Sequence, residues 1–326
     1  MMKFVSVIVA GGLVVGLWGC QEATPSSRTV QPVSAAVADN AYQRAMALLQ
    51  LQFRDQDPIV RANVIEAVQG SADIRAQEII ETGLRDRQWL VRFAATMAAG
   101  KRKAAAVLPV LEQLADEDAS KNVRVGAIYA LQRLGNSKRM TQLATYLNDP
   151  DQEVRANAAL VLGLLGDASA APLLHARRGD VVARVKFELT AALARLGDES
   201  ACNAIRAMSL SRFTDEQFLA MQIASEINLT EAGNIMLAGV DHPMAEGQLL
   251  AVRGLGRLGS RQGEELALKH AEDSNETIRV LAALALGDIP GPGKLERLTS
   301  MLSDRATRVQ VAAASALLNR QNRKLD

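Results

Sequence analysis

The chain has 326 residues, and its 37 Lys and Arg residues nearly balance its 36 Asp and Glu residues, which leaves a formal net charge of +1. Proteins that follow a nucleic-acid backbone usually carry a basic surface, so this balance argues against that class. Ala and Leu dominate, and only 2 Trp, 3 Tyr and 6 Phe are present, which favours helices over sheet. We therefore expect an all-α protein with no nucleic-acid partner.

The first residues have the organisation of a secretory signal. An apolar run extends from Phe4 to Trp18, and it is shorter than the ~20 apolar residues that a membrane-spanning helix needs. Its end, Leu-Trp-Gly-Cys at residues 17–20, resembles the lipobox of bacterial lipoproteins, although Trp18 departs from the usual small or aliphatic residue. The resemblance implies a signal peptide over residues 1–19 and a lipid on Cys20. The alternatives are an uncleaved anchor or a chance cysteine.

A tether is expected next, over residues 20–40, because this segment is rich in Pro, Ser, Thr and Ala and has no apolar periodicity. Gln21 after the cysteine resembles the outer-membrane sorting signal of Gram-negative bacteria. We expect a protein of the bacterial cell envelope that is held to the membrane by its lipid. In a Gram-negative organism it would lie on the outer membrane and face the periplasm.

An acidic and a basic residue then recur at intervals of 31 or 32 residues, which indicates a stacked repeat over residues 41–326. Five copies are complete: Asp55/Arg61, Asp86/Arg92, Asp118/Arg124, Asp149/Arg155 and Asp273/Arg279. Four altered copies keep the register and bring the number of units to nine: Asp180/Lys186, Ser211/Gln217, His242/Gln248 and Asp304/Gln310.

Each unit carries two amphipathic helical patterns. In unit four, Asp151 suits an N-cap, and apolar residues then fall on one stripe of the second helix. Gly166 stands where that helix must end, and the same stop recurs in register at Gly135, Gly197 and Gly259. Such helix pairs bury a continuous seam only when they are stacked, so we predict one elongated domain.

The sequence Asp-Pro-Asp-Gln-Glu-Val-Arg at 149–155, with Ala-Ala-Leu-Val-Leu-Gly-Leu-Leu-Gly at 158–166, resembles HEAT repeats, and most closely the short class of phycobilisome lyase subunits. The resemblance covers residues 41–326. It implies an α-solenoid of about nine two-helix HEAT-like repeats. It says little about function, because the family includes lyase subunits, metal-dependent hydroxylases, DNA-binding enzymes and plain scaffolds.

The registered acidic and basic residues are expected to form a structural ladder between neighbouring units, since an arginine fork binds a carboxylate and nearby carbonyls together. The alternative is that the arginines form a row that binds an anionic ligand. Units six and seven lack the ladder pair and contain Gly233 and Gly239, so we expect the lowest stability there. Three interpretations of units six and seven remain open: a hinge, a partner-binding site, or sequence variation without a function. The ladder residues are Asp55, Arg61, Asp86, Arg92, Asp118, Arg124, Asp149, Arg155, Asp180, Lys186, Asp273 and Arg279.

Residues that would carry chemistry are sparse. The three histidines, His175, His242 and His270, form no His-Glu pair, and no set of cysteines matches a zinc site. Gly254 to Gly259 spells a dinucleotide fingerprint, but it ends a repeat helix and follows no strand. We expect no catalytic residues, no metal and no cofactor, and therefore no enzyme.

A binding surface is the remaining prediction. Arg133, Arg195 and Arg257 occupy the same place in every second unit, and Lys101 also falls there. We expect them on one face of an extended solenoid ~80–90 Å long. The alternative is that these basic side chains serve only to interact favourably with the helix dipole at the C-terminal ends of their helices. The candidate partner-binding residues are Tyr129, Arg133, Glu188, Arg195, Gln222, Arg253 and Arg257.

We interpret the chain as a lipid-anchored envelope scaffold, without catalysis, that binds a partner protein through the concave face of a HEAT-like solenoid. Two alternatives remain open. One is an enzyme or an accessory subunit of the HEAT-like lyase type. The other is an architectural spacer between the membrane and the cell wall.

Overall fold

The structure, a computed structural model, describes residues 35–227, 229 and 231–322. Within these residues it contains eighteen α-helices, two short 3-10 helices and no strand. The prediction of an all-α fold built from nine two-helix repeats is confirmed. The predicted signal peptide (residues 1–19), Cys20 and most of the predicted tether lie outside the described residues.

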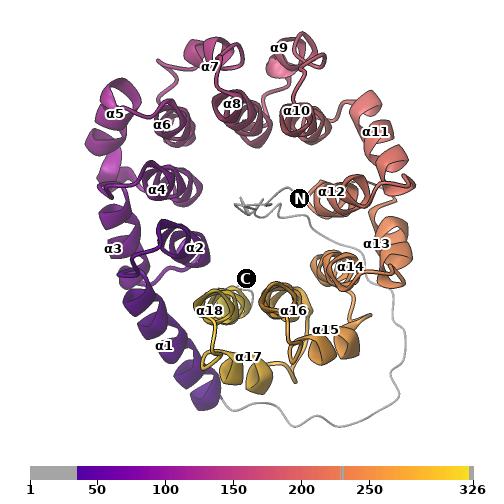
Figure 1. The fold of residues 1–326 in the computed structure, drawn as a ribbon. Helices are drawn as coiled ribbons and strands as arrows, with labels where there is room; N and C mark the ends of the chain where they lie inside the picture. Colours follow the sequence, from indigo (N-terminus) through magenta and orange to yellow (C-terminus); the bar gives the residue numbers. More distant parts are fainter. Residues whose placement is uncertain (1–34, 228, 230, 323–326) are drawn as a thin grey trace.

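The helices form two layers, and each repeat contributes one helix to each layer (Figure 1). The outer helices are α1 (Ala35–Gln52), α3 (Ile74–Gly83), α5 (Leu108–Glu117), α7 (Thr141–Tyr146), α9 (Ala171–His175), α11 (Glu199–Ser209), α13 (Ala232–Val240), α15 (Glu264–His270) and α17 (Leu295–Met301). The inner helices are α2 (Pro58–Val68), α4 (Trp89–Arg102), α6 (Lys121–Arg133), α8 (Gln152–Leu165), α10 (Ala183–Arg195), α12 (Thr214–Ala224), α14 (Ala245–Arg257), α16 (Glu276–Asp288) and α18 (Thr307–Asn322). The 3-10 helices are Ala105–Val107 and Ala168–Ala170.

The first helix begins earlier than the sequence predicts. Helix α1 starts at Ala35, so residues 35–40 are helical, whereas the sequence pattern places them in the tether. The apolar side chains Met46 and Leu49 of this helix are fully buried, and this packing extends the helix backwards into a segment with weak periodicity of its own.

Local signals start and stop the inner helices as predicted. The Asp151 side chain accepts a hydrogen bond of 2.8 Å from the backbone N–H of Glu153 and so caps α8. Gly166 follows α8 with φ 72°, in the left-handed region where a side chain would be strained. The three glycines in the same register are also left-handed: Gly135, Gly197 and Gly259.

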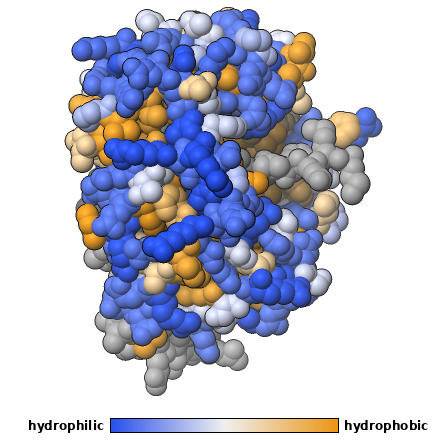
Figure 2. Space-filling model, turned by 60° about the vertical axis from the view of Figure 1, so that its left-hand side comes forward, coloured by the Kyte–Doolittle hydropathy of each residue, from blue (hydrophilic) through white to orange (hydrophobic). Residues whose placement is uncertain are grey.

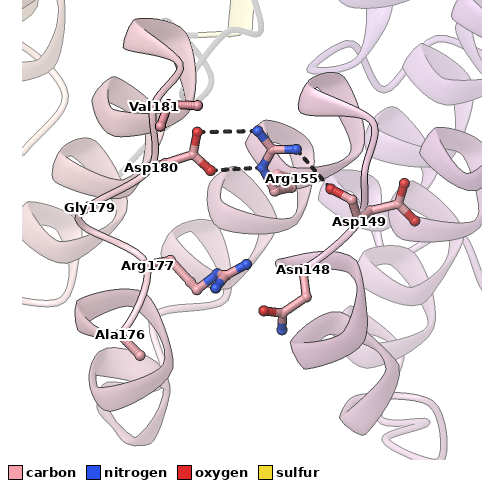
Figure 3. A pocket seen from close by; sticks show the side chains of 8 residues that line it. All are labelled: Asn148, Asp149, Arg155, Ala176, Arg177, Gly179, Asp180 and Val181. Carbon is pink, nitrogen blue, oxygen red and sulfur yellow. Dashed lines mark hydrogen bonds and ion pairs between the residues drawn. The ribbon is translucent and has the colours of Figure 1, made fainter.

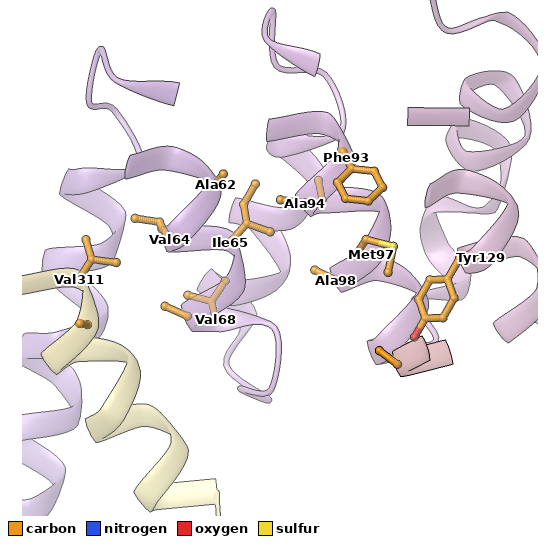
Figure 4. Close-up of a cluster of buried hydrophobic side chains, with 14 of the residues drawn as sticks. Ala62, Val64, Ile65, Val68, Phe93, Ala94, Met97, Ala98, Tyr129 and Val311 are labelled. Atoms are coloured by element: carbon orange, nitrogen blue, oxygen red, sulfur yellow. The ribbon is translucent and has the colours of Figure 1, made fainter. Parts of the chain in front are cut away.

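The nine units close into a ring, and the extended solenoid expected from the sequence is wrong (Figure 1). Helix α18 of the last unit packs against α1 and α2 of the first unit. Val311 of α18 lies beside Val64 of α2 (Figure 4), and these side chains are 3% and 0% exposed. The Gln52 Nε2 amide also donates to Gln310 Oε1 across the same seam at 3.1 Å.

Small residues between the inner helices explain this curvature. A Cβ atom on Gly163 would lie 2.6 Å from the Cα atom of Ala192 on the next inner helix, and one on Gly287 would lie 2.6 Å from the Ala316 Cβ atom. Most neighbouring inner helices are therefore in close contact, with α10 and α12 as the exception, whereas neighbouring outer helices make few contacts with one another. Because the inner helices are packed more closely than the outer helices, each unit is rotated slightly toward the centre of the ring. These rotations add up until the last unit contacts the first.

No helix among the described residues is long and apolar enough to cross a membrane. The outer surface around α1, α3 and α5 is mostly hydrophilic, with apolar side chains in scattered patches (Figure 2). Scattered exposure of this kind is ordinary for a folded domain and marks no site by itself.

The close helix approach predicts opposite effects for two glycine-to-alanine substitutions. Gly163→Ala should lower the free energy of unfolding by about 1–3 kcal/mol, because the new methyl group meets the Ala192 backbone. Gly233→Ala on α13 should raise it by up to about 1 kcal/mol, since nothing lies within 4 Å of the place that its methyl group would take and alanine favours the helix. Urea unfolding of both variants checks the pair, and equal effects would contradict the proposed origin of the curvature.

Candidate functional site on the inner face of the ring

The ladder joins each unit to the following one. Arg155 donates from Nε and Nη2 to the Asp180 carboxylate at 2.7 and 3.2 Å, and from Nη1 to the carbonyl of Asp149 at 2.8 Å. The carboxylate thus comes from the next unit, while the aspartate of the arginine's own unit supplies its backbone oxygen. The same arrangement joins Arg61 to Asp86, Arg92 to Asp118 and Arg279 to Asp304.

Two charged ladder positions depart from this pattern. Arg124 donates from Nε to the carbonyl of Asp118 at 2.6 Å, but Lys121 takes its place at the Asp149 carboxylate, at 2.6 Å. Lys186, in unit five, makes no side-chain hydrogen bond or ion pair within the described residues. The ladder is therefore interrupted after unit five, and it is not an ion pair at every one of the other steps.

Units six and seven lack the ion pair, as the sequence indicates, but neutral groups replace it. The Gln217 amide donates to the Ser211 carbonyl at 2.7 Å, and its Oε1 accepts from His242 Nε2 at 2.9 Å. Gln248 bonds in the same way to the His242 carbonyl at 2.9 Å and to His270 Nε2 at 3.2 Å. An amide and an imidazole therefore keep the connection between these units.

A pocket of about 420 Å³ lies beside the ladder between units four and five (Figure 3). It is lined by Asn148, Asp149, Arg155, Ala176, Arg177, Gly179, Asp180 and Val181. Its charged groups already have protein partners: Arg155 holds Asp180, Asp149 binds Lys121, and Arg177 Nε donates to the Leu147 carbonyl at 3.2 Å. The pocket offers hydrogen-bonded structural groups rather than a free base or nucleophile.

The seven candidate partner-binding residues all lie on inner helices. Tyr129 and Arg133 belong to α6, Glu188 and Arg195 to α10, Gln222 to α12, and Arg253 and Arg257 to α14. Tyr129 is 6% exposed, and the other six are partly exposed. The helices that carry these residues follow one another around the inner circle of a ring (Figure 1) instead of along an extended face.

Three of the four candidate arginines are engaged by acidic residues of the following unit. Arg195 Nη2 lies 2.7 Å from Glu226, and Asp288 lies 3.2 Å from Arg257 Nε and 2.8 Å from Arg253 Nε. Each of these acidic residues stands nine positions after the ladder residue of its unit, as Arg195 and Arg257 do. We call this the rim position, because it lies at or just beyond the C-terminal end of the inner helix. Sequence reasoning missed Glu226 and Asp288, although their register contained the signal.

Charges on distant parts of the ring influence one another across its centre. Burial raises the pKa of Glu66 on α2 to about 8, against the lowering effect of the charges on Lys101 and Arg253. Helices α2 and α4 are neighbours, whereas α14 lies across the inner circle from them (Figure 1), so the influence of Arg253 on Glu66 crosses the ring. Burial likewise raises the pKa of Glu188 on α10 to about 7. The inner face therefore carries less negative charge at neutral pH than its sequence implies.

Within the part of the chain that the structure describes, no three His, Cys, Asp or Glu side chains gather as a metal site would require.

Comparison with known proteins gives a family match over most of the chain. The family described as HEAT repeats matches residues 45–132, 140–216 and 235–318. A search of curated proteins found no match.

Among solved structures, the complex of CpcE and CpcF of phycocyanin lyase from Nostoc sp. PCC7120 is 21% identical, with 73% of this chain and 92% of that chain covered and a TM-score of 0.41. Human deoxyhypusine hydroxylase in complex with glycerol is 18% identical, with 87% and 98% covered and a TM-score of 0.38. Kap121p is 14% identical, with 83% and 37% covered and a TM-score of 0.35.

The ladder predicts a stability difference between two equivalent positions. Arg155→Ala should lower the free energy of unfolding by about 2–4 kcal/mol, because it leaves the nearly buried Asp180 carboxylate without its partner. Gln217→Ala, the neutral counterpart in unit six, should cost only about 1 kcal/mol. Thermal unfolding compares the two, and an Arg155→Ala variant with full stability would contradict a structural role for the ladder.

Glu66 predicts a pH dependence of stability. Its folded pKa lies above the ordinary value of ~4.3, so the folded state binds the extra proton and loses stability as the pH rises from about 4 to about 8. Glu66→Gln should remove this loss and gain about 1–3 kcal/mol relative to the parent between pH 5 and pH 8. Glu78→Gln on the exposed surface of α3 is the control and should change little. Parallel pH profiles for Glu66→Gln and the parent would show that the carboxyl is not buried.

Proposed function

Because the chain belongs to the family of HEAT-repeat proteins, we propose that it is a non-catalytic scaffold that binds a partner protein through the inner face of its ring. The lipid on Cys20 holds the scaffold in the bacterial cell envelope, on the outer membrane and facing the periplasm if the organism is Gram-negative. The observation that carries this proposal is the convergence of charged side chains from separate inner helices, in which Glu66 is influenced by Lys101 and Arg253.

Ring closure supports a particular kind of partner. Nine inner helices at 8–10 Å spacing place their axes on a circle roughly 23–29 Å across. Since a helix with its side chains is about 10–12 Å wide, such a circle admits at most one helix or one extended segment. The partner therefore contributes a tail, a loop or a single helix to the interior, and its folded domains stay outside the ring.

The charge arrangement supports binding rather than catalysis. The pocket beside Arg155 consists of groups that already bind one another, and Arg195, Arg253 and Arg257 are held by acidic residues of the following units. Groups fixed in this way position a bound chain and discriminate among partners by charge, which requires no proton transfer.

The test is chemical crosslinking in intact cells, followed by affinity capture and mass spectrometry. The parent protein and an inner-face variant, Gln222→Arg, are compared with an outer-surface control, Gln50→Arg, because Gln222 is half-buried on α12 whereas Gln50 is exposed on α1. We expect the parent and Gln50→Arg to capture the same envelope protein and Gln222→Arg to lose it.

A Cys20→Ala variant tests the anchor separately. Capture that depends on Cys20 supports the lipid anchor, and equal capture without the cysteine contradicts it. If no discrete protein is recovered with the parent, the scaffold function is wrong. If Gln222→Arg captures the partner as well as the control does, the inner face is not the binding surface.

A further inference from the structure

The rim positions follow a pairing rule that one unit breaks. The rim arginine of unit five, Arg195, binds the rim acid of unit six, and Arg257 of unit seven binds Asp288 of unit eight. Unit three also carries a rim arginine, Arg133, but unit four carries Leu164 at the position where the acid would stand. Among the residues that the structure describes, Arg133 therefore has no carboxylate partner of the kind that its two counterparts have.

Unpaired polar atoms mark the same place. Among the described residues, Arg133 Nε and the neighbouring Gln132 Oε1 are buried and have no hydrogen-bond partner. Arg195 also leaves one buried nitrogen unpaired, but its Nη2 atom binds Glu226. A buried donor without an acceptor costs free energy, and a charged donor costs more, so Arg133 gains from an added acceptor, whereas Gln132 Oε1 requires a donor.

A second basic residue occupies the rim position of the preceding unit. Lys101 occupies the rim position of unit two on the adjacent inner helix, and it makes no side-chain hydrogen bond or ion pair within the described residues. The charged groups that influence Lys101 are Arg257 on α14, across the ring, and Glu66 on the neighbouring helix α2. Burial raises the pKa of Glu66 to about 8 and also lowers the pKa of Lys101 below its ordinary value.

An apolar and an aromatic residue occupy nearby positions in the repeat. Leu164 packs partly against the core, and Tyr129 lies one helical turn before Arg133 on α6. A ligand that fits this site combines a carboxylate with neighbouring apolar groups, as an acidic polypeptide segment does.

We propose that the rim of units two to four binds a carboxylate of an acidic polypeptide segment, which takes the place beside Arg133 that Glu226 takes beside Arg195. The inference rests on the proposed function and specifies the partner segment for the inner face. A carboxylate is favoured over a phosphate because the same repeat position pairs arginine with a carboxylate twice elsewhere in this ring. The arginine fork suits a planar carboxylate and forms a charge-assisted hydrogen bond with it.

Two substitutions at one position provide the sharpest test. Leu164→Glu supplies the missing acid within the chain, and Leu164→Gln removes the same leucine without adding charge. The probe is a short fluorescent peptide of alternating Glu and Leu residues, and the reference peptide carries Gln in place of every Glu. Fluorescence anisotropy measures the binding of both peptides to the folded ring, and circular dichroism checks that each variant keeps its helices.

We expect the parent and Leu164→Gln to bind the Glu peptide and to discriminate against the Gln peptide. Leu164→Glu and Arg133→Gln should both bind the Glu peptide about 10- to 100-fold more weakly, the usual effect of losing a charge-assisted hydrogen bond. Equal affinity of Leu164→Glu and Leu164→Gln would overturn the inference. So would binding by the parent that does not distinguish Glu from Gln.

The result separates this site from the scaffold function. If the Leu164→Glu and Leu164→Gln variants capture the same cellular partner equally, the proposed scaffold function is supported and the carboxylate site is contradicted. The opposite result is also informative. If the Glu peptide binds in the predicted order of variants but no partner is captured in cells, the carboxylate site is supported and the proposed scaffold function is contradicted.

Discussion

The close approach of neighbouring inner helices is the constraint on which the rest of this structure depends. At Gly163 and Gly287 the next helix comes so near that a methyl group would meet its atoms at 2.6 Å. The inner circle is consequently shorter than the outer one, and nine units complete a full turn. Closure of the ring encloses the surface formed by the inner helices, which would be open on an extended solenoid. That enclosure limits which partners can reach the surface.

Two belts of polar contacts hold successive units in register, one at each end of the inner helices. The ladder lies at the N-terminal ends, where arginine forks join aspartates of the next unit and glutamines join histidines instead in units six and seven. The rim lies at the C-terminal ends, where acidic residues of one unit meet arginines of the preceding unit. Every ladder glutamine has a partner, whereas at the rim the unit after Arg133 carries Leu164 in place of an acid. The repeat itself therefore shows which polar group is missing.

Closure also changes the electrostatics of the inner face. Side chains on opposite helices would scarcely influence one another on an extended solenoid, because water and salt screen charges beyond about 10 Å. In the ring, Arg253 on α14 affects Glu66 on α2, and burial raises the pKa of that carboxyl to about 8. The balance of charge inside the ring thus depends on tertiary structure and departs from the nearly neutral balance of the whole sequence.

The sequence by itself determined the repeat, the helix pairs, the Asp151 cap and the left-handed glycines, because these features depend on spacing and on contacts within a few residues. It also placed the candidate arginines on the inner helices. Tertiary structure decided that the ring closes, that Ala35 belongs to a helix, and that Glu226 and Asp288 bind those arginines. The physical reason is that curvature sums many small rotations between units. No single repeat contains that sum, so only the folded chain shows where the last helix meets the first.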